Sequence, residues 1–483
     1  MDPALTFTVT PANAVLSAYA EHIRYSIFMT TNPAGAPPAG ATKNVNVQVA
    51  NPDAPLALGV DESYTIAFPA DGSDATITAN TIYGAMMGLQ TISQAVRYDF
   101  DAGQYAVQAA PLTIADKPKF AWRGILIDTD RHWLSLHTIM RIIDALGMAK
   151  LNIIHWHIVD WQSWPLESKA YTGLWNRSWS PRERYTLNDV KVITQYAAER
   201  GVRVVPEFDT PGHASSMCFA YPELCPSASC SYQTNNPLTP VPDAQGNNVA
   251  LNAIQAVLTE IDAVTTDEFF HLGGDEVDQS CWANTPAVQA WMTKNGIATT
   301  DGVYEYFVSK VDAMTIALNR SPVRWEEVWK HFGTDLDPRT VIHAWLSRDA
   351  LINATSLGYR AIWSVDGQYY LDALGETWDK FYDVDILAGV TNTSAIPLIL
   401  GGETEMWGET ADGSDVLQTI FPRAAAAAER QWSYDVVTNS QDPSVLPRLQ
   451  QFRCLMLERG VPAAPIGNAQ ARTAPGGPGT CLS

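Results

Sequence analysis

Two acidic residues stand side by side at Asp275 and Glu276, directly after the glycine pair Gly273–Gly274. The apolar and aromatic residues before them have the composition of a β-strand, and glycine lets a ligand approach the backbone closely. Two carboxylates at the end of a strand can hold a metal ion, act as an acid–base pair or form a polar loop. The surrounding sequence has to distinguish these three interpretations.

Other residues that can do chemistry also follow runs with strand character. In chain order they are Asp128 to Arg131, Asp160, Glu207, Asp209, His213, Asp275, Glu276, Trp325, Glu326, Glu327, Trp345, Trp407 and Glu409. A single charged strand end is normally a solvated cap, but here the placement recurs after nearly every strand. Because (β/α)₈ barrels build their active sites at the carboxyl ends of the strands, the pattern favours one active site at that face.

The elements that must position these residues begin near Phe120, where strands start to alternate with helices. Eight runs have strand character: 122–129, 151–159, 202–209, 268–275, 323–328, 341–346, 359–365 and 396–403. Apolar spacing predicts helices over 134–150, 186–201, 302–319 and 423–433, whereas the connections after the fifth and seventh strands are expected to be irregular. The fold class is therefore α/β, with a (β/α)₈ TIM barrel and a C-terminal tail over residues 117–483.

Residues 1–116 have a different pattern, which predicts a small α+β domain with an antiparallel sheet packed on one helix. Alternating residues predict strands over 25–31, 44–50, 63–68 and 75–79, and the helix is expected over 81–98. Residues 110–120 are interpreted as the linker to the barrel.

Tryptophan is abundant, with sixteen residues, and several stand at strand ends beside carboxylates. This favours a carbohydrate site, in which indole rings stack on the C–H faces of pyranose rings. Three others, Trp122, Trp363 and Trp432, are expected to pack in the core.

A divalent metal is the main competing interpretation of the acidic cluster. Asp160, His213, Asp275 and Glu276 could ligate such an ion, but they lack the spacing of a recognised metal motif. We therefore expect no metal and no cofactor.

Six motifs occur in order between about residues 120 and 459: WRGILIDTDRHWL, HWHIVDWQSWPLES, RGVRVVPEFDTPGH, FHLGGDEV followed by CW, WEEV, and MWGE. Together they resemble the β-N-acetylhexosaminidases of glycoside hydrolase family 20, and the N-terminal domain resembles the small α+β domain of that family. The resemblance implies an exo-acting enzyme that hydrolyses terminal non-reducing β-linked GlcNAc or GalNAc of an oligosaccharide or glycoconjugate. It also implies a substrate-assisted retaining mechanism with an oxazolinium intermediate.

The resemblance also assigns roles to particular residues. Glu276 would be the general acid/base, Asp275 would hold the N–H of the 2-acetamido group, and Tyr370 would bond its carbonyl. The remaining substrate-binding set consists of Arg131 and Glu409 on the ring hydroxyls, Asp372 on the 4- or 6-hydroxyl side, Trp325, Trp345 and Trp407 around the acetamido methyl, and Asp160 and His213 behind the acid.

The adjacency of the two acids agrees with this division of labour. A conventional retaining glycosidase needs two carboxylates about 5 Å apart that face one carbon, and neighbouring residues of a strand point in opposite directions. Asp275 and Glu276 can instead serve different atoms of the substrate. Their like charges also predict a raised pKa for one of the carboxyls and therefore an acidic optimum.

Alternative functions remain open at this stage. A disaccharide-releasing enzyme of the same family would need a roomier site, and a catalytically silent sugar-binding barrel would not need the acid. An endo-chitinase is disfavoured because no DxxDxDxE run occurs. Trp161 is either an outer sugar platform or a rim residue, and Ala373 beside Asp372 favours a neutral sugar.

The charge and composition disfavour nucleic acid and a membrane as partners. The net charge is −21, from 52 acidic against 31 basic residues, which disfavours nucleic acid. No apolar run is long enough to span a membrane. No signal peptide is visible, and a homodimer is expected only by analogy with the family.

The six cysteines show no CxxC pair and no histidine at zinc-finger spacing, which favours disulfides in an exported protein. Cys454 is expected to pair with Cys481 and hold the tail. The four cysteines between positions 218 and 281 allow three pairings, and Cys281 is expected to join Cys225 or Cys230. Sequons at Asn176, Asn319, Asn353 and Asn392 add weak support for a secreted or lysosomal/vacuolar glycoprotein.

Overall fold

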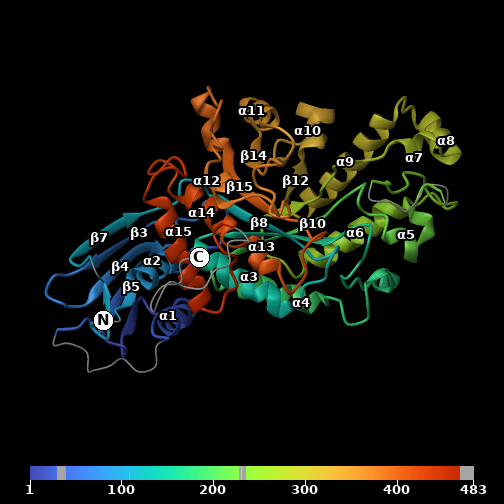
Figure 1. Cartoon of the computed structure of the whole chain (residues 1–483). Helices are drawn as coiled ribbons and strands as arrows, with labels where there is room; N and C mark the ends of the chain where they lie inside the picture. The colour runs from blue at the N-terminus through green and yellow to red at the C-terminus, as the bar shows by residue number, and fades with distance from the viewer. Residues whose placement is uncertain (30–39, 100, 108, 228–229, 231–234, 468–483) are drawn as a thin grey trace.

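The computed structural model describes residues 1–29, 40–99, 101–107, 109–227, 230 and 235–467. Its centre is a closed barrel of eight parallel strands in the order β10-β11-β12-β13-β14-β15-β8-β9 (Figure 1). The strands are β8 (Trp122–Asp128), β9 (Ile153–Val159), β10 (Arg203–Phe208), β11 (Phe269–His271), β12 (Ser321–Trp325), β13 (Val341–Ala344), β14 (Arg360–Trp363) and β15 (Ile399–Met406). The predicted (β/α)₈ barrel is confirmed.

Several predicted strand boundaries were wrong. The fifth strand, β12, stops at Trp325, where an extension to residue 328 was predicted. The fourth strand, β11, stops at His271, so the acidic pair lies in a loop, and the eighth strand, β15, continues to Met406.

Helices between the strands and after the last strand cover the outside of the barrel. They are α3 (Leu136–Ala149), α4 (Leu187–Ala198), α6 (Val249–Asp262), α9 (Thr300–Ala317), α10 (Glu326–Phe332), α11 (Arg348–Ser356), α14 (Arg423–Trp432) and α15 (Val445–Glu458). The shorter elements are η1 (Thr172–Arg177), α5 (Met217–Ala220), η2 (Pro222–Leu224), α7 (Ser280–Ala283), α8 (Pro286–Asn295), η3 (Gly333–Asp335), α12 (Trp378–Tyr382), η4 (Thr393–Leu398) and α13 (Val416–Ile420).

The four predicted barrel helices all form, and α4 begins with a capping box between Thr186 and Asp189. The prediction of an irregular fifth connection was wrong, because α10 starts directly after β12. The seventh connection, after β14, contains only the short elements α12 and η4, as expected.

The interior of the barrel is layered. Eight residues form an apolar cluster inside it: Trp122, Ile153, Val205, Phe269, Val323, Val341, Ile362 and Leu400. Since side chains of a strand alternate between its two faces, residues two positions further along also point inward. Five of those eight positions carry His155, Glu207, His271, Trp325 and His343, all buried. A polar layer therefore lies between the apolar layer and the catalytic face.

The N-terminal domain contains a five-stranded sheet of order β1-β2-β4-β3-β7. Its elements are β1 (Thr6–Thr10), α1 (Ala14–Ile27), β2 (Asn44–Asn51), β3 (Tyr64–Phe68), β4 (Ala75–Thr81), α2 (Ile82–Ala95) and β7 (Leu112–Asp116), with the hairpin β5 (Val96–Asp99) and β6 (Gln104–Val107) beside it.

Three expectations for this domain were wrong. The sheet is mixed, because β1, β2 and β4 run parallel, and parallel neighbours need crossovers such as α1. The predicted strand over 25–31 is contradicted where it is described, because Tyr25–Ile27 belong to α1. Leu112–Asp116 is an edge strand antiparallel to β3, where a linker was expected.

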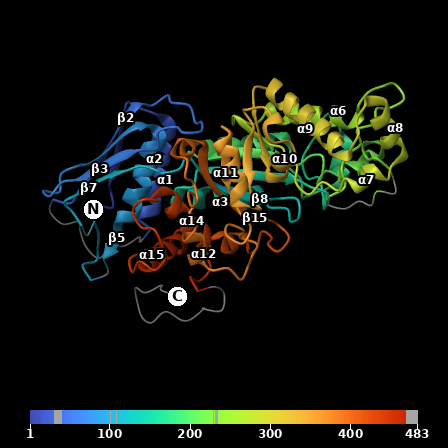
Figure 2. The ribbon, with the colours of Figure 1, turned by 90° about the horizontal axis from the view of Figure 1, so that it is seen from above.

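The two parts of the chain make buried polar contacts. Arg123 of β8 donates to Glu62 at 2.6 Å, and both side chains are nearly inaccessible. Trp432, one of the three tryptophans expected in the core, is buried and donates from its indole to Asp116 at 2.9 Å. In Figures 1 and 2 the N-terminal sheet lies at one end of the molecule, and α7 and α8 lie at the other.

Two disulfides join Cys218 to Cys225 and Cys230 to Cys281. The second is one of the two pairings expected for Cys281. Cys481 lies outside the described residues, so its pairing with Cys454 stays a prediction. Among the helices formed by the described part of the chain, none is both long enough and apolar enough to cross a membrane.

Candidate active site

The acidic pair is held by backbone that few residues can adopt. Gly273, Gly274 and Glu276 all have positive φ, at 60°, 104° and 50°. A Cβ on Gly273 would lie 2.0 Å from Cγ of Asp209, so this glycine is required sterically as well. The prediction that strand alternation points the two carboxylates in opposite directions was wrong, because both acids lie in this turn. Both carboxylates approach Nε2 of His213, Asp275 to 3.7 Å and Glu276 to 3.5 Å.

Asp275 is almost buried and lies against Asp209, which follows β10. Asp209 accepts a hydrogen bond from the Gly274 amide at 2.7 Å. Burial, and then the negative charge of Asp275, hold the pKa of Asp209 well above its usual range. Asp209 therefore carries a proton and can donate it to Asp275 in a hydrogen bond. Sequence reasoning placed Asp209 at a strand end but gave it no role, because its partner comes from another strand.

Glu276 lies at the end of a chain of charged groups. Nε2 of His213 is 3.5 Å from Oε2 of Glu276, and its Nδ1 is 2.8 Å from Oδ2 of Asp160. This contact with His213 lowers the pKa of Glu276 below its ordinary value, even though partial burial opposes the shift. The expectation that repulsion raises the pKa of the catalytic acid is therefore wrong for Glu276. Among these neighbours, the carboxyl whose pKa is raised is that of Asp209.

Asp160 also binds Arg131, with 2.6 Å between Nη2 and Oδ2. The same guanidinium contacts Asp128 at 3.1 Å and approaches Glu409 to 3.8 Å, and it lies over the ring of Trp407 at 5.2 Å. The carboxylates outweigh the effect of burial and keep the pKa of Arg131 well above its usual range. Arg131 is thus a fixed cation between Asp160, which contacts His213 behind Glu276, and the half-exposed Glu409.

The aromatic residues and Tyr370 gather on the side of β12 to β15. Tyr370 stacks on Trp345 at 6.3 Å, and Trp345 donates its indole N–H to Glu327 at 2.8 Å. Trp325 lies 6.1 Å from Trp407. Burial raises the pKa of Tyr370 well above its usual range, so the phenol stays protonated and can donate.

Two further carboxyl groups have raised pKa values. Burial, and then the charge of Asp275, raise the pKa of Glu327 to about 7. Burial, and then Glu409, raise the pKa of Asp372 to about 6. Sequence reasoning placed Glu327 at a strand end but did not foresee that it would fix Trp345.

The residues nearest the acidic pair are poor ligands for a divalent metal. Asp209, His213 and Asp275 lie close enough together to form a triad. However, the surrounding carboxylates raise the pKa of His213 well above its usual value against the effect of burial, so both of its nitrogens carry protons. With Asp209 protonated as well, two of the three groups offer hydrogens where a cation needs lone pairs. The arrangement fits a ligand that is bound by hydrogen bonds.

All eleven predicted site residues lie at or beyond the carboxyl ends of barrel strands. The structure brings Glu276, His213, Asp160, Arg131 and Glu409 into one network of contacts. A second group forms around Tyr370, Trp345, Trp325 and Trp407, and Asp275 lies between the two, because its charge acts on both His213 and Tyr370. Asp372 joins the site through Glu409.

Comparisons with known proteins agree with this geometry. Residues 120–435 match the family model "Glycosyl hydrolase family 20, catalytic domain", and residues 11–95 match a model described as "beta-acetyl hexosaminidase like". The chain is 46% identical over 435 residues to beta-hexosaminidase 1 of Arabidopsis thaliana, covering 89% of this chain and 79% of the relative. It is 36% identical over 419 residues to the mouse beta-hexosaminidase subunit beta, covering 85% of this chain and 75% of the relative.

Among solved structures, the chitobiase of Flavobacterium johnsoniae superposes with a TM-score of 0.83 at 26% identity, over 95% of this chain and 70% of the other. The family match covers more than half of the chain and includes the whole barrel. The chain therefore belongs to glycosyl hydrolase family 20 and is a β-N-acetylhexosaminidase of that family.

Proposed function

We propose that this enzyme removes terminal β-linked GlcNAc or GalNAc from the non-reducing end of neutral oligosaccharides or glycoconjugates, with the substrate's own acetamido oxygen as nucleophile. The observation that carries the proposal is the different surroundings of the two adjacent acids. Glu276 is half-exposed and lies 3.5 Å from Nε2 of His213, whereas Asp275 is buried beside the protonated Asp209.

These surroundings support separate tasks. Glu276 gives its proton to the glycosidic oxygen as the bond to C1 breaks. Asp275 accepts the acetamido N–H while Tyr370 donates to the acetamido carbonyl, which aims that oxygen at C1. The oxygen closes an oxazolinium ring, and Asp275 stabilises the positive charge. Glu276 then takes a proton from water, which attacks C1, opens the ring and leaves the β configuration retained.

Turnover of nitrophenyl β-GlcNAc, β-GalNAc and β-glucoside tests the proposal. Only the first two substrates carry an acetamido group, so we expect hydrolysis of both and at least a 1,000-fold lower kcat/KM for the glucoside, on the order of what one lost catalytic group costs. Equal rates on all three would overturn substrate assistance. Release of disaccharides alone from a β-GlcNAc-terminated oligosaccharide would instead favour the disaccharide-releasing alternative.

A catalytically silent sugar-binding barrel is disfavoured because the acid keeps its full support from His213 and Asp160. A lectin gains nothing from a charge network that prepares a proton donor.

We also propose that the enzyme works in an oxidising compartment, either outside the cell or in a lysosome or vacuole. The two disulfides support this location, because the cytosol keeps thiols reduced. The large negative charge disfavours nucleic acid as a partner. A homodimer stays a prediction.

A further inference from the structure

Two glutamates, Glu326 and Glu327, open helix α10 directly after β12. Acidic residues in the first turn of a helix commonly stabilise its N-terminus. Here both side chains also reach across to residues 345–347, the segment that joins β13 to α11. Helices α10 and α11 lie next to each other (Figure 1), so each glutamate can bind the neighbouring βα connection.

Glu326 holds the backbone that follows Trp345. Its side chain is fully buried, and its Oε2 accepts hydrogen bonds from the amides of Leu346 at 2.8 Å and Ser347 at 2.9 Å. Its Oε1 accepts the Ser347 hydroxyl at 2.5 Å and pairs with Lys330 at 2.7 Å. Because both oxygens have donors, the buried carboxylate is satisfied, and it fixes the two residues after Trp345.

Glu327 holds the ring of Trp345. Its Oε2 accepts the indole N–H at 2.8 Å. The same ring stacks on Tyr370, with 6.3 Å between the centroids and 22° between the planes. A stacked contact restrains the plane of a ring but lets the ring slide and turn within that plane. The hydrogen bond to Glu327 removes this remaining freedom.

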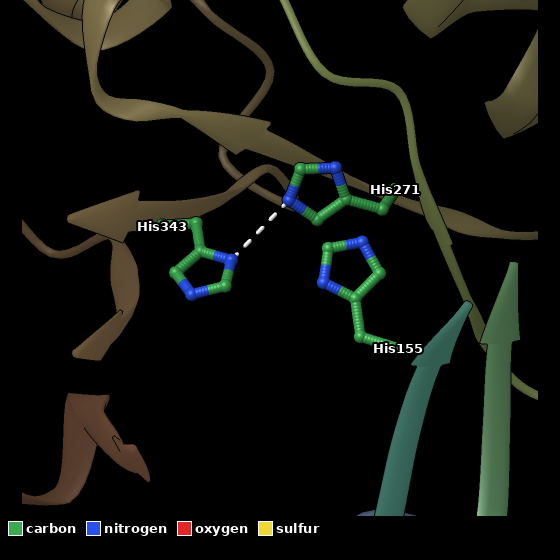
Figure 3. Close-up of side chains that lie close together, drawn as sticks. All are labelled: His155, His271 and His343. Atoms are coloured by element: carbon green, nitrogen blue, oxygen red, sulfur yellow. Dashed lines mark hydrogen bonds between the residues drawn. The ribbon is translucent and has the colours of Figure 1, made fainter. Parts of the chain in front are cut away.

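The tryptophans of the site are held in different ways. Trp325 is 1% exposed, donates its indole N–H to Glu207 at 2.9 Å and stacks at 4.3 Å on His343, one of the three buried imidazoles in Figure 3. Trp345 is partly exposed and packs against none of the apolar clusters that the described residues form. The position of Trp345 therefore depends on Tyr370 and on the two glutamates.

These contacts lie beside the groups that bind the acetamido group in the mechanism above. Burial, and then the charge of Asp275, raise the pKa of Glu327 to about 7, and the same charge acts on Tyr370. Asp275, Glu327 and Tyr370 thus border one region of the site. At pH 5 Glu327 carries a proton and is a neutral acceptor for the indole N–H.

We propose that Glu326 and Glu327 are positioning residues that clamp Trp345 and thereby set which acyl groups the enzyme accepts on the nitrogen at C2 of the sugar. The inference rests on the function proposed above, in which Trp345 borders the acetyl methyl while the acetamido oxygen attacks C1. A ring that cannot move leaves space of fixed size and keeps the oxygen aimed at C1. A ring that can move admits a longer acyl chain but aims the oxygen less well.

Glu327→Leu tests the clamp, because leucine has a similar size and no acceptor. The measurement is the ratio of kcat/KM for nitrophenyl β-GlcNAc to kcat/KM for its N-propionyl analogue, at pH 5. We expect kcat/KM for nitrophenyl β-GlcNAc to fall by about 10- to 100-fold, and the ratio to fall at least about fivefold, because one methylene in a fitted pocket is worth about 10- to 200-fold. An unchanged ratio would overturn the proposal.

Glu327→Gln is the conservative variant. Its amide oxygen can accept the same indole hydrogen, and at pH 5 it matches the neutral charge of Glu327. It should restore the ratio to within about twofold of the wild type, a difference smaller than one lost hydrogen bond makes. A glutamine variant as unselective as Glu327→Leu would contradict the clamp, because the acceptor is still present.

Trp345→Phe removes the same hydrogen bond from the other side, since phenylalanine keeps an aromatic ring without an N–H. By itself it should lower the ratio, and adding Glu327→Leu should change the ratio less than about twofold further, because the contact is already lost. Losses that multiply would show that Glu327 does not act through Trp345. A ratio of two substrates on one preparation does not depend on how much enzyme is folded, and Trp345→Phe with a wild-type ratio would refute the clamp even if Glu327→Leu does not fold.

Glu326→Gln should lower the ratio in the same direction, because the amide retains only one acceptor oxygen for the backbone beside Trp345. Glu260→Gln is its matched control. Oε1 of Glu260 accepts the amides of Lys169 at 3.0 Å and Ala170 at 2.8 Å, in another connection of the barrel. The control should leave the ratio unchanged, and an unchanged ratio in Glu326→Gln would refute the role of Glu326.

Asn353→Leu is the control for Glu327→Leu, because Asn353 accepts the indole N–H of Trp329 at 3.1 Å and Trp329 packs in the core. It should lower Tm and leave the ratio unchanged. If either control lowers the ratio as much as its partner does, the loss reflects general destabilisation and the clamp is refuted. The proposed function is tested separately: a wild type that does not hydrolyse nitrophenyl β-GlcNAc refutes that function, whereas an active wild type with unchanged ratios in the variants refutes only the clamp.

Discussion

Replacing His213 with asparagine isolates the contact that sets the acidity of Glu276. His213 has a φ of 52°, and asparagine is among the side chains that adopt this left-handed conformation most readily. The asparagine amide can occupy the place of Nδ1 and keep the hydrogen bond to Asp160, whereas nothing replaces Nε2 beside Glu276.

The expected size of the effect follows from the distance. A cationic His213 lies 3.5 Å from Glu276, which corresponds to about 1.2 kcal/mol at the dielectric constant of water. The aqueous value is appropriate because the Glu276 side chain is 44% exposed. This energy corresponds to about one pKa unit.

Glu276 must be protonated to act as the acid, so kcat/KM is high below its pKa and falls as pH rises through it. His213 lowers this pKa in the free enzyme, so the wild type should lose kcat/KM already between pH 4 and pH 7. His213→Asn should move this alkaline limb about one unit higher and reduce the maximal rate.

The assay is the pH profile of kcat/KM for nitrophenyl β-GlcNAc, measured for the wild type, His213→Asn and the control His331→Asn. His331 is a partly exposed histidine that pairs with Asp301 at 3.1 Å away from the acid. Its replacement should leave the profile in place. If the alkaline limb of the kcat/KM profile keeps its wild-type position in His213→Asn, or moves to lower pH, His213 is not the group that sets the acidity of Glu276.

Three more outcomes are expected. Glu276→Gln should reduce kcat on nitrophenyl β-GlcNAc by at least about 100-fold but spare a substrate whose leaving group needs no proton; equal losses on both would contradict the acid role. Gly273→Ala should lower both kcat and Tm, because the new Cβ meets Asp209 and φ is positive; a variant with wild-type values would show that the turn is not constrained as described. Replacing Cys230 and Cys281 with serine opens a loop that spans 51 residues and should lower the free energy of unfolding by up to about 4 kcal/mol, measured by denaturant titration; no loss would argue against this disulfide.

Much of the site was predictable because its residues follow their own strands directly. Asp160, Trp325 and Trp345 stand at or next to the last residue of a strand, and parallel strands in a barrel bring those positions to one face. The mixed N-terminal sheet was not predictable in the same way, because alternation identifies a strand without identifying its neighbour. The edge strand Leu112–Asp116 and the helix α1 were missed for this reason, since their pattern is short or ambiguous when read alone.

The sequence by itself determined the barrel, the ring of chemically capable residues and the adjacency of Asp275 and Glu276. It could do so because these properties depend on local alternation and on spacing along one chain segment. Only the tertiary structure decided which carboxyl is protonated. Whether Asp209 carries the proton and Glu276 is more acidic than usual depends on burial and on charges that three different strands bring together. The same convergence in space, invisible along the chain, brings His155, His271 and His343 together beneath the site.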